Sequence, residues 1–412
     1  MVIDRDLYQQ TRKRFAERLK EPSCCIIFSG TPKKVTADDE YPFFADLNFQ
    51  YLTGLDREGM IYAVSKTSDQ VREMIFAPDN DEKEERWHGK RMSSDEIRQF
   101  TGIENIRASE DYGAWLVDVT GQEDIKILTD LSSVTNETAD LVKNCGDRIG
   151  DVSRILEDMR LIKSPYEISC IREAAKITED AIEDLKGFIK EGMTEYDVYA
   201  RLEYELARRS GPVFSFATIT ACNDNSLYLH HSRADRDMKV VSGGYIQIDC
   251  GARVNGYCAD ISRVIFTGGK SPAEDPSDKR YLLHAVIKEM RKEAVAFIKP
   301  GVTFAKLNAL MHDICYDRLK ELGLIGEDED KAEAVKRYYW HNTSHFLGLN
   351  VHDVGSKDKE FSEGMTLAVE PGVYIPEWNM GFRIEDDVLV TSGGCEYLSS
   401  GNDSAEEGFI CI

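Results

Sequence analysis

Five side chains in the second half of the chain have the types and settings that bind divalent cations. Four are carboxylates beside apolar, β-rich runs, and the fifth is an imidazole in the glycine-bent segment 340–355. An oxygen-rich donor set with one imidazole favours a pair of ions that hold a bridging hydroxide and polarise a carbonyl. The sequence therefore predicts the site of a two-metal hydrolase. In chain order, the predicted metal ligands are Asp249, Asp260, His345, Glu370 and Glu385.

Asp249 and Asp260 are joined through Asn255-Gly256, a strong signal for a two-residue hairpin. In such a hairpin the numbers of facing residues sum to an odd number, as 249 and 260 do. Both side chains are therefore expected on one face, opposite or diagonal to each other. Two carboxylates this close repel, which raises one pKa unless a cation lies between them. The alternative for this pair alone is a turn cap or an ion pair with Arg253 or Arg263.

The other three predicted ligands each have a simpler explanation when they are taken singly. Glu370 ends the apolar run 365–369, where a charge needs a partner. Alternation places Glu385 on the same face as Arg383, so a plain ion pair could explain both. His345 alone could be a core histidine. His341 and His345 also have the spacing of a zincin, but Asn342 replaces the required glutamate, which excludes that class.

The first part of the chain, residues 1–150, reads as a small α/β domain, and 151–412 as a second domain. The charged segment 79–86 predicts a solvated loop. Apolar runs in the first domain predict strands at 23–29, 48–54, 60–64 and 71–77.

The second domain opens with a helix whose start is marked by Ser164, Pro165 and Glu167, a capping box with proline at the first helical position. A short repeat then relates two parts of this domain, because Phe-Ile-Lys-Glu-Gly-Met-Thr at 188–194 recurs as Phe-Ile-Lys-Pro-Gly-Val-Thr at 297–303. Each copy joins two amphipathic helices and is followed by predicted strands. The repeat predicts two related helix–helix–strand halves.

The composition excludes several other functions. The net charge of −23 over 412 residues disfavours nucleic acid and anionic membranes as partners. No run of about 18 apolar residues predicts a membrane span, and the first residues lack a signal peptide. The ten cysteines form no Cys-x-x-Cys pair. We expect reduced cysteines and a cytoplasmic protein.

These motifs resemble the pita-bread metallopeptidases, specifically the branch of Xaa-Pro aminopeptidase (aminopeptidase P) and prolidase. The resemblance covers nearly the whole chain, and the order of the motifs is specific. The motifs that carry it are Ile-Asp249-Cys-Gly, Ala-Asp260-Ile-Ser-Arg, Ser-His345-Phe-Leu-Gly, Val-His352-Asp-Val-Gly, Val-Glu370-Pro-Gly and Arg383-Ile-Glu385-Asp-Asp.

The resemblance implies an α+β fold, with a C-terminal pita-bread domain of pseudo-two-fold halves after a smaller creatinase-like α/β domain. It implies two divalent ions. Mn²⁺ is the expected metal, and Co²⁺, Zn²⁺ and Fe²⁺ are alternatives. Asp249 would bind one ion, Asp260 and Glu385 would bridge both, and His345 and Glu370 would complete the other shell. Glu370 would also act as general base and then acid.

The resemblance further implies that His230, His352 and Arg383 position the substrate and stabilise the oxyanion, and that His341 lines the proline pocket. The family pattern here is Leu-His-Tyr, whereas this chain has Leu229-His230-His231. His231 is therefore an alternative to His230 for the same role.

The predicted function is the release of the N-terminal residue from peptides with proline second, by attack of a hydroxide held between two metals, in a homodimer. One alternative is a prolidase restricted to Xaa-Pro dipeptides. Another is a metal-free pita-bread protein that binds partners without hydrolysis.

Overall fold

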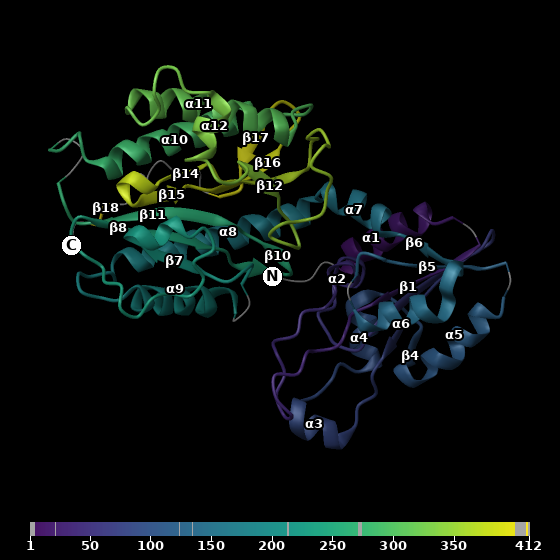
Figure 1. The fold of residues 1–412 in the computed structure, drawn as a ribbon. Helices are drawn as coiled ribbons and strands as arrows, with labels where there is room; N and C mark the ends of the chain where they lie inside the picture. Colours follow the sequence, from purple (N-terminus) through teal and green to yellow (C-terminus); the bar gives the residue numbers. More distant parts are fainter. Residues whose placement is uncertain are drawn as a thin grey trace. The chain divides into compact units, whose positions relative to one another are not determined.

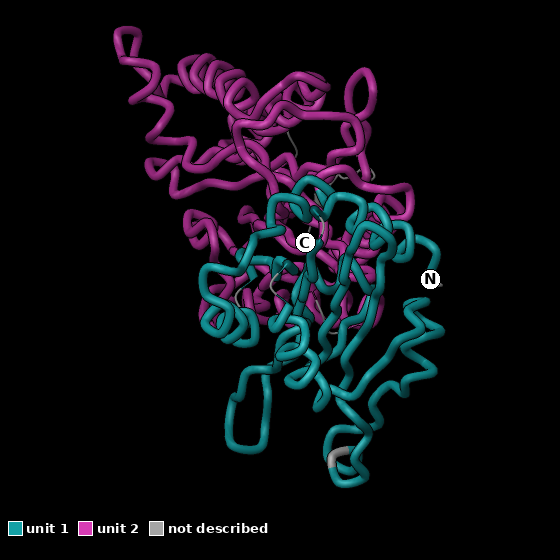
Figure 2. The backbone as a smooth tube through the Cα atoms, turned by 90° about the vertical axis from the view of Figure 1, so that its right-hand side faces the viewer, with its two compact units in different colours: residues 1–160 teal, residues 161–412 magenta. Residues whose placement is uncertain are grey.

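The chain forms two compact units, residues 1–160 and 161–412 (Figure 2). The computed structural model describes residues 5–20, 22–122, 124–133, 135–211, 214–270 and 274–399, and the backbone of 409–410. The division lies after Arg160, ten residues beyond the predicted domain boundary, because the helix α7 (Ser153–Leu161) is bonded to the first unit. The hydroxyl of Tyr51 donates to the Met159 carbonyl at 3.0 Å, and Nη1 of Arg160 donates to Oδ1 of Asn48 at 2.8 Å.

The first unit is a mixed six-stranded sheet with strand order β4-β3-β2-β1-β5-β6 and helices around it. The central strand β1 is buried along its whole length and pairs antiparallel with β2 and parallel with β5. The strands are β1 (Ser23–Phe28), β2 (Ile61–Lys66), β3 (Val71–Ala77), β4 (Ile106–Ala108), β5 (Lys126–Thr129) and β6 (Ile149–Asp151). The helices before α7 are α1 (Arg5–Arg18), α2 (Leu47–Thr53), α3 (Glu82–His88), α4 (Ser94–Thr101), α5 (Tyr112–Thr120) and α6 (Asn136–Cys145).

Two local predictions in this unit are wrong. The predicted strand 48–54 is the helix α2, all of whose residues except the first are buried, so no polar face reveals a helical period. Asp46 starts this helix by accepting the first backbone N–H groups, and Gly54 ends it at φ 75°. The predicted loop 79–86 overlaps α3, which begins at Glu82 and which Asp81 caps in the same way.

The second unit places two groups of strands between two pairs of helices (Figure 1). Figure 1 shows α8 and α9 on the outer side of β7 and β8, and α10 and α11 on the outer side of the strands at the C-terminal end. The helices are α8 (Pro165–Lys186), α9 (Glu195–Ser210), α10 (Lys279–Phe297), α11 (Phe304–Glu321) and α12 (Lys331–Lys336). The strands of the first half are β7 (Ile219–Cys222), β8 (Gly244–Cys250), β9 (Arg253–Val254), β10 (Tyr257–Cys258) and β11 (Ile261–Thr267). Those that follow are β12 (Ser344–Phe346), β13 (Thr366–Val369), β14 (Gly372–Ile375), β15 (Met380–Arg383), β16 (Asp386–Val390), β17 (Cys395–Tyr397) and β18 (Phe409–Ile410).

The two halves of this unit repeat one plan, as the short sequence repeat predicts. In the first half, α8 and α9 precede the antiparallel neighbours β7-β8-β11, and in the second, α10 and α11 precede β12-β13-β16. The repeated heptapeptide joins the two helices in each case. This α+β architecture is the pita-bread fold that the family resemblance implies.

The predicted helix start at Ser164 is confirmed. Ser164 and Glu167 form a capping box with Pro165 in the first turn of α8, and Thr194 and Asp197 form a second capping box at the start of α9. No helix in the described part of the chain is both long and apolar enough to cross a bilayer.

A buried carboxylate ties the second half to the first. Asp386, the first residue of β16, accepts from Nη2 of Arg263 at 2.7 Å, Nη1 of Arg291 at 2.6 Å and Oγ of Ser399 at 2.8 Å. Burial opposes its ionisation, but the two arginines hold the pKa of Asp386 below its usual value. The carboxylate is therefore charged and fully engaged at neutral pH.

Replacing Asp386 by asparagine is expected to lower the free energy of unfolding by about 3–5 kcal/mol, because two buried guanidinium groups lose their shared counter-charge. Urea unfolding near neutral pH measures the change. Asp180→Asn is the matched control, because its pair with Lys176 lies on the surface of α8, and such exposed pairs contribute little to stability. Equal stabilities of the two variants would contradict the prediction.

Candidate metal centre

The hairpin that carries the first two predicted ligands has the expected turn. Asn255 and Gly256 both have positive φ, 49° and 89°, as a type I′ turn requires. The register of β8 and β11 pairs Asp249 with Ser262, so Asp260, just before β11, lies two residues away on the same face. The diagonal arrangement of the two aspartates is thus present.

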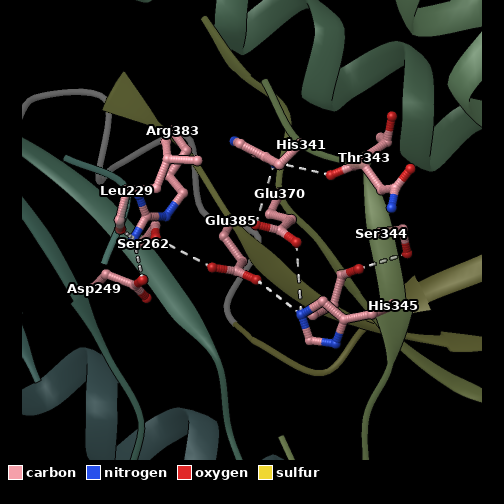
Figure 3. Close-up of polar contacts among 12 residues, drawn as sticks. Leu229, Asp249, Ser262, His341, Thr343, Ser344, His345, Glu370, Arg383 and Glu385 are labelled. Atoms are coloured by element: carbon pink, nitrogen blue, oxygen red, sulfur yellow. Dashed lines mark hydrogen bonds and ion pairs between the residues drawn. The ribbon is translucent and has the colours of Figure 1, made fainter. Parts of the chain in front are cut away.

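The second half supplies the other three residues from neighbouring strands. His345 is the middle residue of β12, Glu370 directly follows β13, and Glu385 directly precedes β16. Because β13 pairs with both β12 and β16, these positions lie beside one another. Figure 3 shows the carboxylates of Glu370 and Glu385 directed at the His345 ring.

The distances describe a loose cage around one imidazole nitrogen. Nε2 of His345 lies 3.4 Å from Oδ2 of Asp260, 3.7 Å from Oε1 of Glu370 and 3.8 Å from Oε1 of Glu385. Donor atoms of Asp260, His345 and Glu385 all lie within 4.8 Å of one another, close enough to share an ion. Asp249 stands at the edge of this group, where its Oδ2 accepts from Nη2 of Arg383.

All five predicted ligands line a single cavity of about 620 Å³, a size typical of small-molecule sites. The predicted substrate-binding residues His230, His341, His352 and Arg383 also line it. The structure therefore brings together nine of the ten residues that the sequence singled out, from segments up to 155 positions apart.

The electrostatics of the cage fit a cation. Burial, and then the charges of neighbouring carboxylates, raise the pKa values of Asp260 and Glu385 well above their usual range. Burial also raises the pKa of Glu370 to about 7. Among the described residues, the buried oxygens Asp249 Oδ1 and Glu385 Oε1 accept no hydrogen bond. Carboxylates that repel one another and keep buried oxygens without a hydrogen bond are what divalent ions would neutralise, so these residues fit the predicted metal pair.

In the metal-free protein, Glu385→Gln is expected to be more stable than the native chain at about pH 8, with a smaller advantage at about pH 5. The folded-state pKa of Glu385 is raised, so its stabilising contribution exists only while it is protonated and is lost as the pH rises. The side-chain amide introduced by Glu385→Gln does not titrate, so the stability of the variant lacks this pH dependence. Melting temperatures of both EDTA-treated proteins across this range measure the effect, and a difference that does not vary with pH would contradict it.

Burial lowers the pKa values of His341 and His352, which lie beside the cage, to about 4, so both rings are neutral near pH 7. Nε2 of His341 is 2.9 Å from the Tyr374 hydroxyl, and its ring stacks on Tyr339. The His352 ring lies 4.3 Å from that of His345. Neutral imidazoles can pack against an apolar group or exchange hydrogen bonds with a carbonyl.

Arg383 is buried, and the Asp249 carboxylate raises its pKa although burial opposes the charge. Besides Asp249, Nη2 of Arg383 donates to the Leu229 carbonyl at 3.2 Å, as Figure 3 shows. Its backbone N–H donates to Oε1 of Gln247 at 2.9 Å. The guanidinium is thus a fixed cation beside the carboxylates. Arg383 pairs with Asp249. The alternative from the sequence, a plain ion pair between Arg383 and Glu385, is therefore not what the structure shows.

The two adjacent histidines lie in different surroundings. His230 lines the cavity, whereas His231 is not among the described residues that do. Nε2 of His231 lies instead 2.6 Å from Oε1 of Glu195, the first residue of α9. The position of His231 as an alternative substrate-binding residue is therefore not supported by its surroundings, because its ring is already engaged by a buried carboxylate.

Two residues that the sequence analysis did not single out support the cage. Oδ2 of Asp387 accepts the backbone N–H of Asp260 at 3.1 Å, and Oγ of Ser262 donates to Oε2 of Glu385 at 3.1 Å. The sequence does contain a signal for Asp387. Three successive acids, Glu385, Asp386 and Asp387, lie in an apolar strand region, where they cannot all point to solvent. Ser262 gave a weaker one, as the residue opposite Asp249 in the hairpin.

Known proteins share both the sequence pattern and this fold. Residues 169–392 match the family described as metallopeptidase family M24, and residues 8–128 match the aminopeptidase P N-terminal domain. Xaa-Pro aminopeptidase of Escherichia coli is 26% identical, over 97% of this chain and 95% of its own.

Two solved structures are similar over nearly their whole length. A putative aminopeptidase P from Bacillus anthracis is 30% identical, with a TM-score of 0.89 over 99% of both chains. Zn-substituted E. coli aminopeptidase P in complex with product is 26% identical, with a TM-score of 0.88 over 99% of this chain and 98% of that one. On the match of its second unit and on these relatives, the chain belongs to metallopeptidase family M24.

Proposed function

We propose that this protein is a dinuclear-metal aminopeptidase that releases the N-terminal residue from peptides with proline at the second position. The observation that carries the proposal is the single cavity that all five potential ligands line together with His230, His341, His352 and Arg383. The named relatives, Xaa-Pro aminopeptidase and aminopeptidase P, support the substrate class.

We assign the ions to Asp249, Asp260, His345, Glu370 and Glu385, of which Asp260 and Glu385 would be shared. When bound, the ions lower the pKa of an attacking water and stabilise negative charge on the scissile carbonyl oxygen. The carboxylate-rich donor set is compatible with Mn²⁺ as the first ion to test, and with Co²⁺, Zn²⁺ and Fe²⁺. The Zn-substituted aminopeptidase P of E. coli supports including Zn²⁺ among the ions to test.

In this mechanism Glu370 moves the proton. Its Oε2 is the oxygen that lies 3.6 Å from Nδ1 of His341, while Oε1 is turned to His345. A carboxylate beside the scissile bond can take a proton from water and return it to the leaving nitrogen of proline.

The other cavity residues orient the peptide. Arg383, held by Asp249 and the Leu229 carbonyl, is a fixed positive charge near the developing oxyanion. The neutral ring of His352 and the ring of His230, which both line the cavity, can exchange hydrogen bonds with the peptide backbone. His341, stacked on Tyr339, offers a flat, apolar wall for the proline ring.

We also propose a cytoplasmic homodimer. The nine cysteines among the described residues are all free, which is typical of a reducing compartment. Exposed aromatic side chains in the first unit, Tyr41 and Trp87, offer a surface for a second subunit. Light scattering measures the mass in solution.

The function is tested by metal analysis and a short peptide panel. We expect about two metal equivalents per chain, loss of turnover in EDTA and its recovery with Mn²⁺. The peptides are Arg-Pro-Pro, Gly-Pro and Arg-Ala-Pro. Cleavage of Arg-Pro-Pro at its N-terminus, with Arg-Ala-Pro cut far more slowly, supports the aminopeptidase. Turnover of Gly-Pro alone would indicate a strict prolidase, and a chain without metal or turnover would indicate a binding protein.

A further inference from the structure

The segment between β7 and β8 carries two groups of the candidate active site. His230 lines the cavity, and the Leu229 carbonyl accepts from Arg383. Apart from the single 3-10 turn Asn223–Leu227, this segment has no regular structure before β8. Something other than a strand or helix therefore has to hold these two groups in place.

The buried carboxylate of Glu195 binds this segment on both sides of His230. Glu195 is the first residue of α9 and is fully buried. Its four partners come from both ends of the segment. They are Cys222 N at 2.7 Å and Asn225 Nδ2 at 3.0 Å on Oε2, and His231 Nε2 at 2.6 Å and Asp235 N at 2.6 Å on Oε1.

The geometry fixes the direction of His230 through its neighbour. The backbone N–H of His231 also donates to the Tyr228 carbonyl at 3.1 Å, so both its backbone and its ring are held. With His231 turned toward Glu195, the preceding side chain is left at the cavity. The position of Glu195 in the first turn of α9 further stabilises its carboxylate in this place, because a helix N-terminus favours a negative charge.

We propose that Glu195 and His231 are positioning residues for the peptidase reaction, which anchor the segment 223–235 so that His230 and the Leu229 carbonyl keep their places in the cavity. The inference rests on the proposed function for its effect on turnover. The anchoring itself is a property of the chain and can be measured without substrate.

A set of single variants tests the anchor. His231→Leu and Glu195→Gln remove the contact between ring and carboxylate, whereas His231→Gln keeps an N–H donor. Glu205→Gln is the matched control, because Glu205 is also buried on α9 but its carboxylate, among the described residues, pairs only with arginines of the same helix, Arg201, Arg208 and Arg209.

We expect His231→Leu and Glu195→Gln to lower kcat/KM about 10–100-fold, as for residues that orient active-site groups, with metal content unchanged. His231→Gln should recover most of the activity. Glu205→Gln should keep native kcat/KM even if its melting temperature falls. Loss of activity in Glu205→Gln equal to that in Glu195→Gln would overturn the proposal, since both would then reflect general destabilisation.

A double-mutant cycle asks whether His231 acts through His230. The His231→Leu change should cost much less in the His230→Ala background than in the native protein, because the group to be positioned is already gone. Additive losses would overturn the positioning role.

Hydrogen exchange separates this inference from the proposed function. Backbone amides of 223–235 should exchange faster in His231→Leu and Glu195→Gln than in the native chain or Glu205→Gln. Unchanged exchange would refute the anchor, whereas a native protein that cleaves no peptide would refute the proposed function and leave the exchange result standing.

Discussion

Replacing Asp260 by asparagine is expected to lower kcat/KM by at least about 10⁴-fold and to reduce bound metal below two equivalents per chain. The side chain keeps its size, so the effect comes from the lost charge. Asp260 contributes to the group of Asp260, His345 and Glu385 whose donor atoms lie within 4.8 Å of one another, and we assign it to both ions. Elemental analysis and peptide turnover, each at saturating Mn²⁺, measure the two losses.

In the metal-free protein, the same substitution is expected to preserve or raise stability. Burial and neighbouring carboxylates raise the pKa of Asp260, so removal of its charge should leave the metal-free protein at least as stable as the native one. Adding Mn²⁺ should then raise the melting temperature of the native chain more than that of the variant. Asp180→Asn on the surface of α8 should behave as the native protein throughout. A fully metal-loaded, inactive Asp260→Asn would contradict the assignment of this residue as a ligand.

Glu370→Gln is expected to lower kcat by about 10³–10⁴-fold, because the amide preserves shape but cannot carry the proton from water to the leaving nitrogen. The variant should lose one limb of the pH profile of kcat/KM, and KM should change much less than kcat. Steady-state kinetics between about pH 5 and pH 9 give both quantities.

Two comparisons complete this prediction. Glu377→Gln removes the same charge from an exposed side chain that accepts from Tyr338, and should leave the kinetics native. Metal content of Glu370→Gln separates proton transfer from ion binding. If full activity returns at high Mn²⁺, Glu370 acts only as a ligand, and the proton-transfer role is refuted.

Part of the candidate metal centre was predictable, because the hairpin that carries its two aspartates obeys local rules of chain geometry. The Asn255-Gly256 turn fixes the register of its hairpin, and that register alone places Asp249 and Asp260 on one face. The helix starts at Ser164 and Thr194 follow from capping chemistry in the same way. The nearness of the two hairpin aspartates to Glu385 does not follow from such rules and came from resemblance.

The errors have equally physical causes. The buried helix α2 has no polar face, so its apolar residues resemble a strand. The segment that holds His230 and His231 has no period, so the sequence cannot tell which ring enters the cavity. Asp387 was overlooked because its role, to accept the Asp260 backbone N–H, depends on contact between strands of two different sheets.

The origin of the proposed ligands in both halves of the second unit has a consequence for the lifetime of the protein. Asp249 and Asp260 belong to the first half, and His345, Glu370 and Glu385 to the second. Ions that bind all five would fasten the halves together, so unfolding would require their release. Free metal at about 100 times its dissociation constant would add about 2.7 kcal/mol of stability. Proteolytic turnover of the enzyme would then slow as the supply of its metal rises, and starvation for the ion would remove the protein as well as its activity.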